Sequence, residues 1–430
     1  MKLRIISVLM LLWVLPLWSQ NYLDVVRPFY GMRGVSGSES GIFPISAAHS
    51  NAVVGNPALL SFSEQAFFSM DMSLDQVSGS SIFESQQTDL EEFQKIRFNN
   101  MTYVYPVRVY RGAWVWGFNL QPVHSFNSIQ KYAGVDSDNG ADFVYSHLHR
   151  STGNIYALSM ATSFLWTRNT SLGFGASLLT GRNDYNVVYR ESDTQDLFTF
   201  DNYLDSLTIS PRYRGFSARM GITSDLADAF RVGLTLEFPT RLSVSESSSQ
   251  QELESQDDGS ETILYEADYP RLEYGLWGPW RLGVGLAFMV DPLSVSVNYR
   301  YHSFSTASMT SNLIDGNGDE LDAIIDSEIK KYVSDVHEYS AAVNWSMTPL
   351  DITFAATVEN LPLNDHLDNI LRMDAGFAYQ LTPKVGITTA FRSISWQSDL
   401  DHELFSGTLR HVEVKNSFSQ LSLGVKYFLD

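Results

Sequence analysis

The sequence predicts an all-β protein, a transmembrane antiparallel β-barrel of about fourteen strands whose N-terminal segment plugs the lumen. Three observations lead to this class. The chain begins with a secretory signal, its apolar residues alternate with polar ones in segments of about ten residues, and tight turns alternate with long polar connections. A tilted strand of about ten residues crosses a bilayer, so the combination is typical of the bacterial outer membrane.

The start of the chain has the layout of a signal peptide. Lys2 and Arg4 provide positive charge, and the apolar stretch that follows is too short to span a bilayer comfortably. Pro16 ends that stretch, and the small residue Ser19 suits a cleavage site. A membrane anchor that stays attached is the alternative, but no basic stop-transfer flank follows. We therefore expect export.

The composition excludes several other classes. None of the 430 residues is cysteine, which rules out a lipoprotein signal, a disulfide scaffold and a thiolate metal site. The formal net charge of −20 argues against nucleic acid as a partner, because nucleic acids bind clustered Lys and Arg. Beyond the signal, no uninterrupted apolar run is long enough for a membrane-spanning helix. One large, strand-rich unit is the simplest account.

Period-2 alternation defines the expected strands. In Ser171–Thr180, Phe230–Phe238 and Leu293–His302 the apolar residues share one face, and small, polar or charged residues share the other. A soluble sandwich would show the same alternation, so the connections must decide. The last run, Ser417–Leu429, is the kind of terminal strand that the barrel-assembly machinery binds, although Phe428 is out of phase with its apolar face.

The connections between these runs are of two kinds, tight turns and long polar segments. The tight turns lie near residues 110–112, 167–170, 224–229, 291–292, 348–351 and 382–384. The long segments, expected as extracellular loops, lie near 75–98, 121–152, 182–211, 241–270, 306–336, 361–370 and 397–415, with a short helix at Leu321–Tyr332. The hairpins and the two terminal runs give about fourteen strands, an even number that lets the first and last strands pair.

Residues 20–64 do not fit a spanning strand. They are rich in glycine and serine, yet they contain enough apolar residues to pack. We expect them to fold back into the barrel as a plug; a disordered periplasmic tail is the alternative. The chain therefore divides into a signal peptide at 1–19, a plug at 20–64 and a barrel at 65–430.

The stretch that contains Asn56, Pro57 and Ala58 resembles the junction between plug and first strand in FadL-type (FadL/TodX-like) transporters of long-chain fatty acids and other hydrophobic compounds. Pro279–Phe288 and Phe377–Val385 are similar to later hairpins of such barrels. The resemblance implies capture of hydrophobic, fatty acid-like molecules at the extracellular loops. It also implies that the plug, with Asn56, Pro57 and Ala58 at its end, gates the lumen, and that the ligand leaves sideways into outer-membrane lipid.

Two sets of residues are candidates for the path of the ligand. Gly117 and Pro122 fall in the third expected strand, Ala113–Pro122, where they mark a bulge or a missing hydrogen bond. The resemblance implies a lateral opening there; an ordinary strand end at Pro122 is the alternative. Inward-facing arginines are candidates for binding a ligand carboxylate, or for pairing with the plug or with neighbouring acids. These arginines are Arg108, Arg219, Arg231, Arg281, Arg300 and Arg392.

Metal binding and catalysis have weaker support. Asp315, Asn317 and Asp319 space oxygen ligands as a calcium loop does, but Glu320 stands where such a loop requires glycine, and a solvated loop is the alternative. No Gly-x-Ser-x-Gly elbow and no clustered triad is present, so we expect neither an enzyme nor a cofactor. The alternative to transport is a plugged barrel that serves as a partner or anchor in protein secretion or surface attachment, similar to PorV-type barrels.

Overall fold

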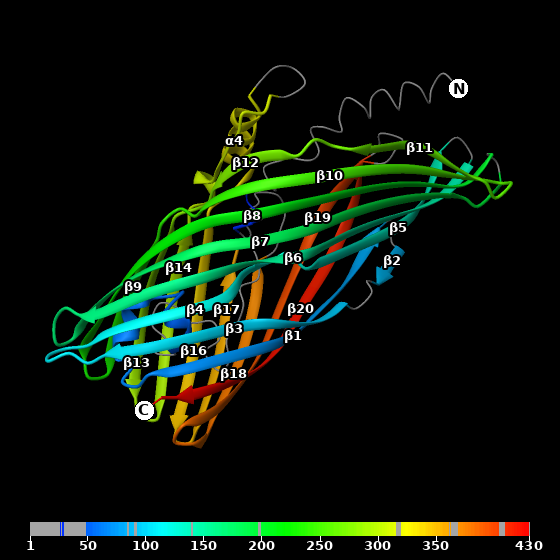
Figure 1. Cartoon of the computed structure of the whole chain (residues 1–430). Helices are drawn as coiled ribbons and strands as arrows, with labels where there is room; N and C mark the ends of the chain where they lie inside the picture. Colours follow the sequence, from blue (N-terminus) through cyan, green and yellow to red (C-terminus); the bar gives the residue numbers. More distant parts are fainter. Residues whose placement is uncertain are drawn as a thin grey trace.

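The structure is a computed structural model that describes residues 26, 28–29, 49–83, 86–89, 93–138, 141–196, 199–314, 320–360, 362, 369–403 and 409–429. The expected signal peptide lies outside these residues, as do Asp315, Asn317 and Asp319 of the candidate calcium loop. Fourteen strands close into one antiparallel barrel, which confirms the predicted fold class (Figure 1). Within the described ranges, no helix has the length and apolar character needed to span a membrane.

The barrel is a simple up-and-down ring in which each strand pairs with its neighbours along the chain. In order around the ring the strands are β1 (Phe67–Phe83), β3 (Phe93–Val107), β4 (Trp114–Ser125), β6 (Ala141–Leu165), β7 (Thr170–Asp193), β8 (Phe200–Ala227), β9 (Phe230–Glu237), β13 (Arg281–Val290), β14 (Leu293–His302), β16 (Val336–Met347), β17 (Leu350–Glu359), β18 (Ile370–Thr382), β19 (Val385–Glu403) and β20 (Leu409–Phe428). The ladder from Phe67↔Phe428 onward joins β1 to β20 and closes the ring.

Further elements are not members of this ring. They are β2 (Gln86–Asp89), β5 (Ser128–Asp138), β10 (Arg241–Gln256), β11 (Glu261–Asp268), β12 (Leu272–Trp277), β15 (Ser308–Thr310), α3 (His49–Ala52), η1 (Pro57–Phe62), η2 (Phe304–Thr306) and α4 (Leu321–Tyr332). β5 pairs with β6 and β10 with β8, and β11 and β12 then pair with β10. We call β5, β10, β11 and β12, with the adjoining parts of β6, β7 and β8, the outer extension; it projects beyond the other strands in Figure 1.

The expectation of long loops is wrong for much of the chain. The segments 75–98, 121–152, 182–211, 241–270 and 397–415 are mostly strand. Both faces of strands outside a bilayer can be polar, so these strands lack the apolar alternation that marks a spanning strand. The predicted helix at Leu321–Tyr332 is confirmed with the same bounds as α4.

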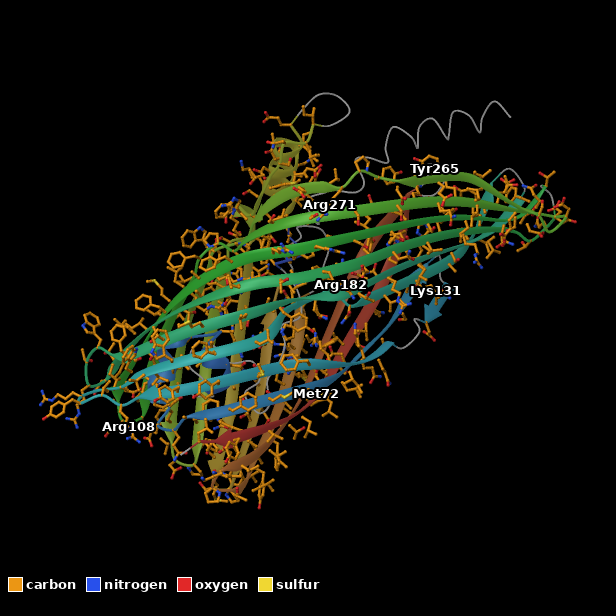
Figure 2. The ribbon with its side chains drawn as sticks, in the orientation of Figure 1. Met72, Arg108, Lys131, Arg182, Tyr265 and Arg271 are labelled. Atoms are coloured by element: carbon orange, nitrogen blue, oxygen red, sulfur yellow. The ribbon has the colours of Figure 1, made fainter. Side chains whose placement is uncertain are left out.

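The outward faces of the barrel strands form an apolar belt (Figure 2). On β7, Phe174 and Leu178 are 48% and 61% exposed, on the face that the alternation predicts. A short strand such as β13 has 10 residues, which at about 3.3 Å per residue and about 40° of tilt cover roughly 25 Å of bilayer. Trp114 at the tight-turn end, and Trp277 and Trp280 at the other, are exposed as in the aromatic girdles of outer-membrane barrels. Tight turns face the periplasm in such barrels, so the outer extension is extracellular.

Candidate lumenal binding site

The site begins with residues 49–62, here called the N-terminal segment, which contact inward-facing side chains near the tight-turn end. Asn56 caps η1: its Oδ1 accepts a hydrogen bond from the backbone N–H of Ala58 at 3.1 Å, and its Nδ2 donates to Thr223 Oγ1 at 3.0 Å. Ser171 Oγ donates to the Ala58 carbonyl at 2.6 Å, and Ser163 Oγ donates to it at 3.2 Å. The junction is therefore bonded to three adjacent strands, β6, β7 and β8.

Two glycines of the wall make room for this junction. A Cβ atom added to Gly221 would lie 1.9 Å from Asn56 Oδ1, and one added to Gly173 would lie 2.2 Å from the backbone nitrogen of Ala58 and 2.3 Å from the carbonyl carbon of Pro57. Real Cβ atoms essentially never come within 3.0 Å of a neighbour. A side chain at either position would therefore push the N-terminal segment away from the wall.

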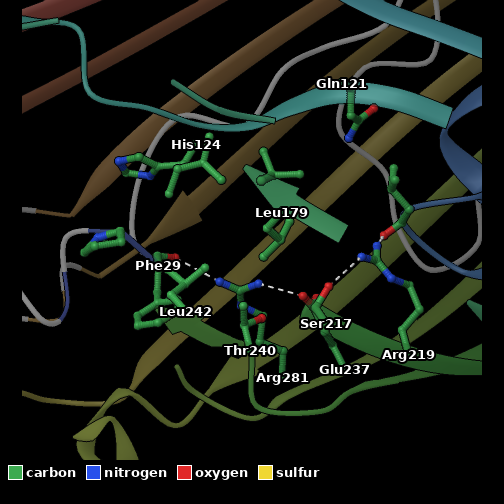
Figure 3. A pocket seen from close by; sticks show the side chains of 14 residues that line it. Phe29, Gln121, His124, Leu179, Ser217, Arg219, Glu237, Thr240, Leu242 and Arg281 are labelled. Atoms are coloured by element: carbon green, nitrogen blue, oxygen red, sulfur yellow. Dashed lines mark hydrogen bonds and ion pairs between the residues drawn. The ribbon is translucent and has the colours of Figure 1, made fainter. Parts of the chain in front are cut away.

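Two of the candidate arginines bind backbone carbonyls that precede η1. Arg219 Nη1 donates to the carbonyl of Val54. Arg281 Nη2 donates to the carbonyl of Phe29 at 2.8 Å, while its Nη1 pairs with Glu237 at 2.9 Å (Figure 3). Both guanidiniums are thus engaged by the protein itself, so a ligand carboxylate would compete with these contacts.

Arg231 also contacts the N-terminal segment, whereas Arg108 does not lie where the alternation predicts. Arg231 lies 3.9 Å from the ring centroid of Phe62 and pairs with Asp225 at 2.7 Å. Arg108, predicted to face the lumen, is exposed in the tight turn at the end of the barrel (Figure 2). The alternation that placed it inward stops at Val107, where β3 ends.

Arg300 and Arg392 belong to an ion-pair network on the facing side of the ring. Arg300 pairs with Glu338 at 3.3 Å and Arg392 with Asp374 at 2.6 Å, while Arg372 bridges both acids at 3.2 and 3.5 Å. Sequence reasoning missed both acids and Arg372, although Glu338 and Asp374 alternate with outward apolar neighbours along β16 and β18. These three arginines pair with acids of wall strands.

A cavity of about 70 Å³ lies between the wall and the first described residues (Figure 3). Its apolar lining includes Phe29, Val123, Ile155, Leu179 and Leu242, and the remainder of the lining includes both carbonyl-binding arginines. Ligand pockets usually enclose about 300–1,000 Å³. A ligand larger than a few atoms therefore enters only if the residues around Phe29 move.

On the extracellular side of this cavity the lumen is apolar. The buried cluster there draws on the wall, on β10 and β12 of the outer extension and on α4, whose Ile325 and Ile329 face inward. Its other members are Val26, Phe29, Phe126, Ile155, Ala157, Leu179, Tyr213, Leu242, Val244, Tyr274, Leu276, Phe304, Ala307, Met309, Val333 and Val336. The interior of a water-filled porin is polar. An apolar lumen suits a hydrophobic solute.

The wall beside the cavity is only partly paired. The β3–β4 ladder ends at Met101↔Leu120, and no further strand pairs with this edge of β3 among the described residues. Asn99 is the extra residue of a bulge between β1 and β3, and Val123 is the extra residue of a bulge between β4 and β6. Pro122 lies next to that second bulge and has no N–H to donate. Two irregular strands therefore face each other where the ladder stops.

The cavity reaches this interrupted part of the wall, because Gln121, Val123 and His124 of β4 line it. Pro122 thus lies in the part of the wall where the resemblance implies a lateral opening. It is not the end of a strand, because β4 continues past it to Ser125. Gly117 does not mark a break in the wall, since it is paired with β3 on one side and with β6 on the other. A Cβ atom at Gly117 would instead meet Val53 at 2.6 Å.

Comparisons with known proteins agree with this architecture. No protein-family model and no curated protein matches the sequence. Among solved structures, the Pseudomonas putida toluene transporter TodX is similar with a TM-score of 0.60 at 12% identity, over 93% of this chain and 99% of that one. The Ralstonia pickettii toluene transporter TbuX gives 0.57 at 14% identity, over 93% and 99%. A Pseudomonas aeruginosa FadL homologue gives 0.55 at 12% identity, over 91% and 96%.

These likenesses extend over nearly the whole of each chain. The protein is therefore an outer-membrane-type barrel, and more specifically it has the fold of the FadL-type barrels. The resemblance first suggested by Asn56, Pro57 and Ala58 is confirmed at the level of the fold. Within the part of the chain that the structure describes, no group of three or more acids and histidines is placed to bind a metal ion.

Proposed function

We propose that this protein is an outer-membrane channel for the uptake of small hydrophobic compounds. The observation that carries the proposal is the apolar lumen, which opens onto a cavity closed off by Phe29 and Val54. A path for ions or sugars would be polar, as in porins. TodX and TbuX, two barrels of this fold, are toluene transporters, which supports a hydrophobic solute.

The residues of the cavity favour an uncharged ligand over a fatty acid. Arg219 and Arg281, the two cations in the lining, already bind Val54, Phe29 and Glu237. A carboxylate would compete with these contacts, whereas a neutral ring needs only the apolar side of the cavity. We therefore favour compact, uncharged compounds as the cargo, with long-chain fatty acids as the alternative cargo.

We propose further that the N-terminal segment is the gate of this channel and acts as a plug. Asn56, Pro57 and Ala58 form its tightest contact with the wall, against Gly173 and Gly221. The contact consists of few hydrogen bonds and one close-packed surface, so local displacement costs far less than unfolding the barrel. Passage would require that displacement.

Release is proposed to be lateral, through the interrupted wall between β3 and β4. Asn99, Pro122 and Val123 bound the gap, and the cavity reaches it. Deletion of Asn99 removes the extra residue and is expected to make the β1–β3 ladder regular and to lower uptake several-fold. Uptake that stays at the wild-type rate in a correctly assembled deletion variant would argue against this route.

The channel proposal is tested by uptake into cells that express the protein. Labelled toluene should enter faster in cells with the wild-type barrel than in cells with the empty vector, and a labelled long-chain fatty acid should show a smaller difference. Equal rates of toluene and of fatty acid uptake with and without the barrel would overturn the proposal. A stably bound protein partner in that case would support the alternative, a partner or anchor in secretion.

A further inference from the structure

The outward face of the outer extension carries a group of exposed arginines in a chain whose net charge is −20. They lie on β7, β8 and β10 and just before β12, strands that pair side by side (Figure 1). We call this group the outer arginine patch. Its members are Arg182, Arg212, Arg214, Arg241 and Arg271, of which Arg182 and Arg271 are labelled in Figure 2.

The strand register brings these side chains together on one face. Arg182 and Arg212 are direct partners across β7 and β8, so their Cβ atoms are about 5 Å apart. Arg214 follows Arg212 on the same face of β8. Arg271 Nε donates to Ser245 Oγ, and Ser245 is the partner of Arg212 across β8 and β10.

Protein carboxylates neutralise this patch only in part. Asp184 lies 3.9 Å from Arg182 and Glu273 lies 4.0 Å from Arg271, and all four side chains are at least half exposed. Arg212 and Arg214 have no carboxylate within 4.0 Å among the described residues. Two like charges directly opposite each other destabilise a strand pair. An anion that binds between them would remove this repulsion.

The patch lies immediately outside the apolar belt. Phe216 is two residues from Arg214 on the same face of β8, and it is the direct partner of Leu178 and of Arg241. Leu178, Phe216 and Trp277 are 61%, 50% and 39% exposed, which places them in the bilayer or at its surface. The next residues outward on these strands, which include Arg214, Arg212 and Arg182, therefore lie at the depth of the lipid headgroups of the outer leaflet.

We propose that the outer arginine patch binds the phosphate groups of an outer-leaflet glycolipid, the lipid A part of lipopolysaccharide. Guanidinium groups bind phosphate through paired, charge-assisted hydrogen bonds, and clustered basic residues at the edge of an apolar belt are typical lipid-headgroup sites. Ser243 and Ser245 on β10, the direct partners of Arg214 and Arg212, add hydroxyl donors. The acyl chains of the same lipid would lie on Leu178 and Phe216.

The proposal is tested on the full-length protein in phosphatidylcholine nanodiscs, with bisphosphorylated lipid A added and bound lipid counted by native mass spectrometry. Arg212→Gln with Arg214→Gln is expected to weaken lipid A binding by about tenfold or more. Arg212→Lys with Arg214→Lys keeps the charge and should retain most of the binding. Arg108→Gln with Arg111→Gln removes two exposed arginines from the tight turn at the other end, and should leave binding unchanged.

The lipid itself is varied in a second arm. Lipid A without phosphates should bind the wild type as weakly as the phosphorylated form binds the double Gln variant, and inorganic phosphate alone should compete only at high concentration. Equal binding of phosphorylated and dephosphorylated lipid A to the wild type would overturn the proposal. So would a double Gln variant that is assembled, as its resistance to SDS shows, and still binds within twofold of the wild type.

Discussion

The two sides of the barrel differ in length and in what their inner faces contact. β6, β7 and β8 have 25, 24 and 28 residues, whereas β13, β14, β16 and β17 have 10, 10, 12 and 10. The short side ends near the edge of the bilayer. The long side continues outward, binds the N-terminal segment, and carries much of the cavity lining and the arginine patch.

The inward-facing charges follow the same division. Arg300 on the short strand β14 and Arg392 on β19 pair with acids of neighbouring wall strands. Arg219 on the long strand β8 binds a backbone carbonyl of the N-terminal segment, and Arg231 on the next strand, β9, packs on its Phe62. The ion pairs of β14, β16, β18 and β19 therefore hold wall strands to one another, whereas the contacts of β8 and β9 with the N-terminal segment can be broken without opening the barrel.

The largest expected effect is on the short side. Glu338 is 4% exposed and pairs with Arg300 and Arg372, so Glu338→Ala leaves buried cations without their carboxylate. We expect a loss of about 3–5 kcal/mol in the free energy of unfolding. Urea-induced unfolding in lipid vesicles measures it. Glu273→Gln, an exposed acid of the outer extension, should change stability by less than about 0.5 kcal/mol, and equal losses in the two variants would contradict the division.

The next effect is on the gate and should leave the barrel intact. Gly173→Val puts a branched side chain where even a Cβ atom meets Ala58 at 2.2 Å. We expect the N-terminal segment to leave the wall and the barrel to conduct ions that the wild type excludes, recorded as current across a planar bilayer.

Gly386→Ala is the matched control for that variant, because its Cβ atom would meet nothing closer than 3.7 Å. It should conduct no more than the wild type. If Gly173→Val inserts normally and stays as closed as Gly386→Ala, the N-terminal segment is not what closes the lumen.

The smallest expected effect is a pH dependence of the outer extension. Asp205 and Glu252 face each other across β8 and β10. Burial raises the pKa of both carboxyls, and the neighbouring Asp205 raises the pKa of Glu252 further. An acid whose pKa is raised by folding stabilises the folded form. This stabilisation is complete at a pH below the pKa of the acid in the unfolded chain, about 4, and it is lost as the pH rises through the pKa of the acid in the folded protein.

The outer extension should therefore resist protease better at pH 5 than at pH 8. Asp205→Asn removes one of the two acids and should reduce this difference, measured as the ratio of variant to wild-type cleavage rates at each pH so that the activity of the protease cancels. That ratio should be lower at pH 8 than at pH 5, because the wild type loses more resistance than the variant as the pH rises. A ratio that is equal at the two pH values, or higher at pH 8, would refute the assignment.

Much of the barrel could be predicted because a bilayer enforces contrast between the two faces of a strand. Leu172, Phe174 and Leu178 on β7 had to be apolar, and the glycines and serines between them had to face inward. Helix α4 was predictable for a similar reason, since Ile325 and Ile329 lie one helical turn apart and pack against the apolar lumen.

The bulges and the ion-pair partners depend on the register between strands, which cannot be determined from the residue type at one position. Asn99 and Val123 become bulges only when their strands pair with particular residues of β1 and β6. The acids that pair with Arg300 and Arg392 alternate visibly along β16 and β18, but which arginine meets which acid follows from the ladders. Strands of the outer extension have no bilayer to impose contrast, so their sequence reads as loop.

The central claim is that the apolar lumen of the long side holds the hydrophobic cargo. A crystal structure with iodobenzene tests it directly, because anomalous scattering locates the iodine. Iodine is expected in an enlarged cavity among Phe29, Ile155, Leu179 and Leu242. Iodine found only on the outer belt, or beside the ion pairs of the short side, would contradict it.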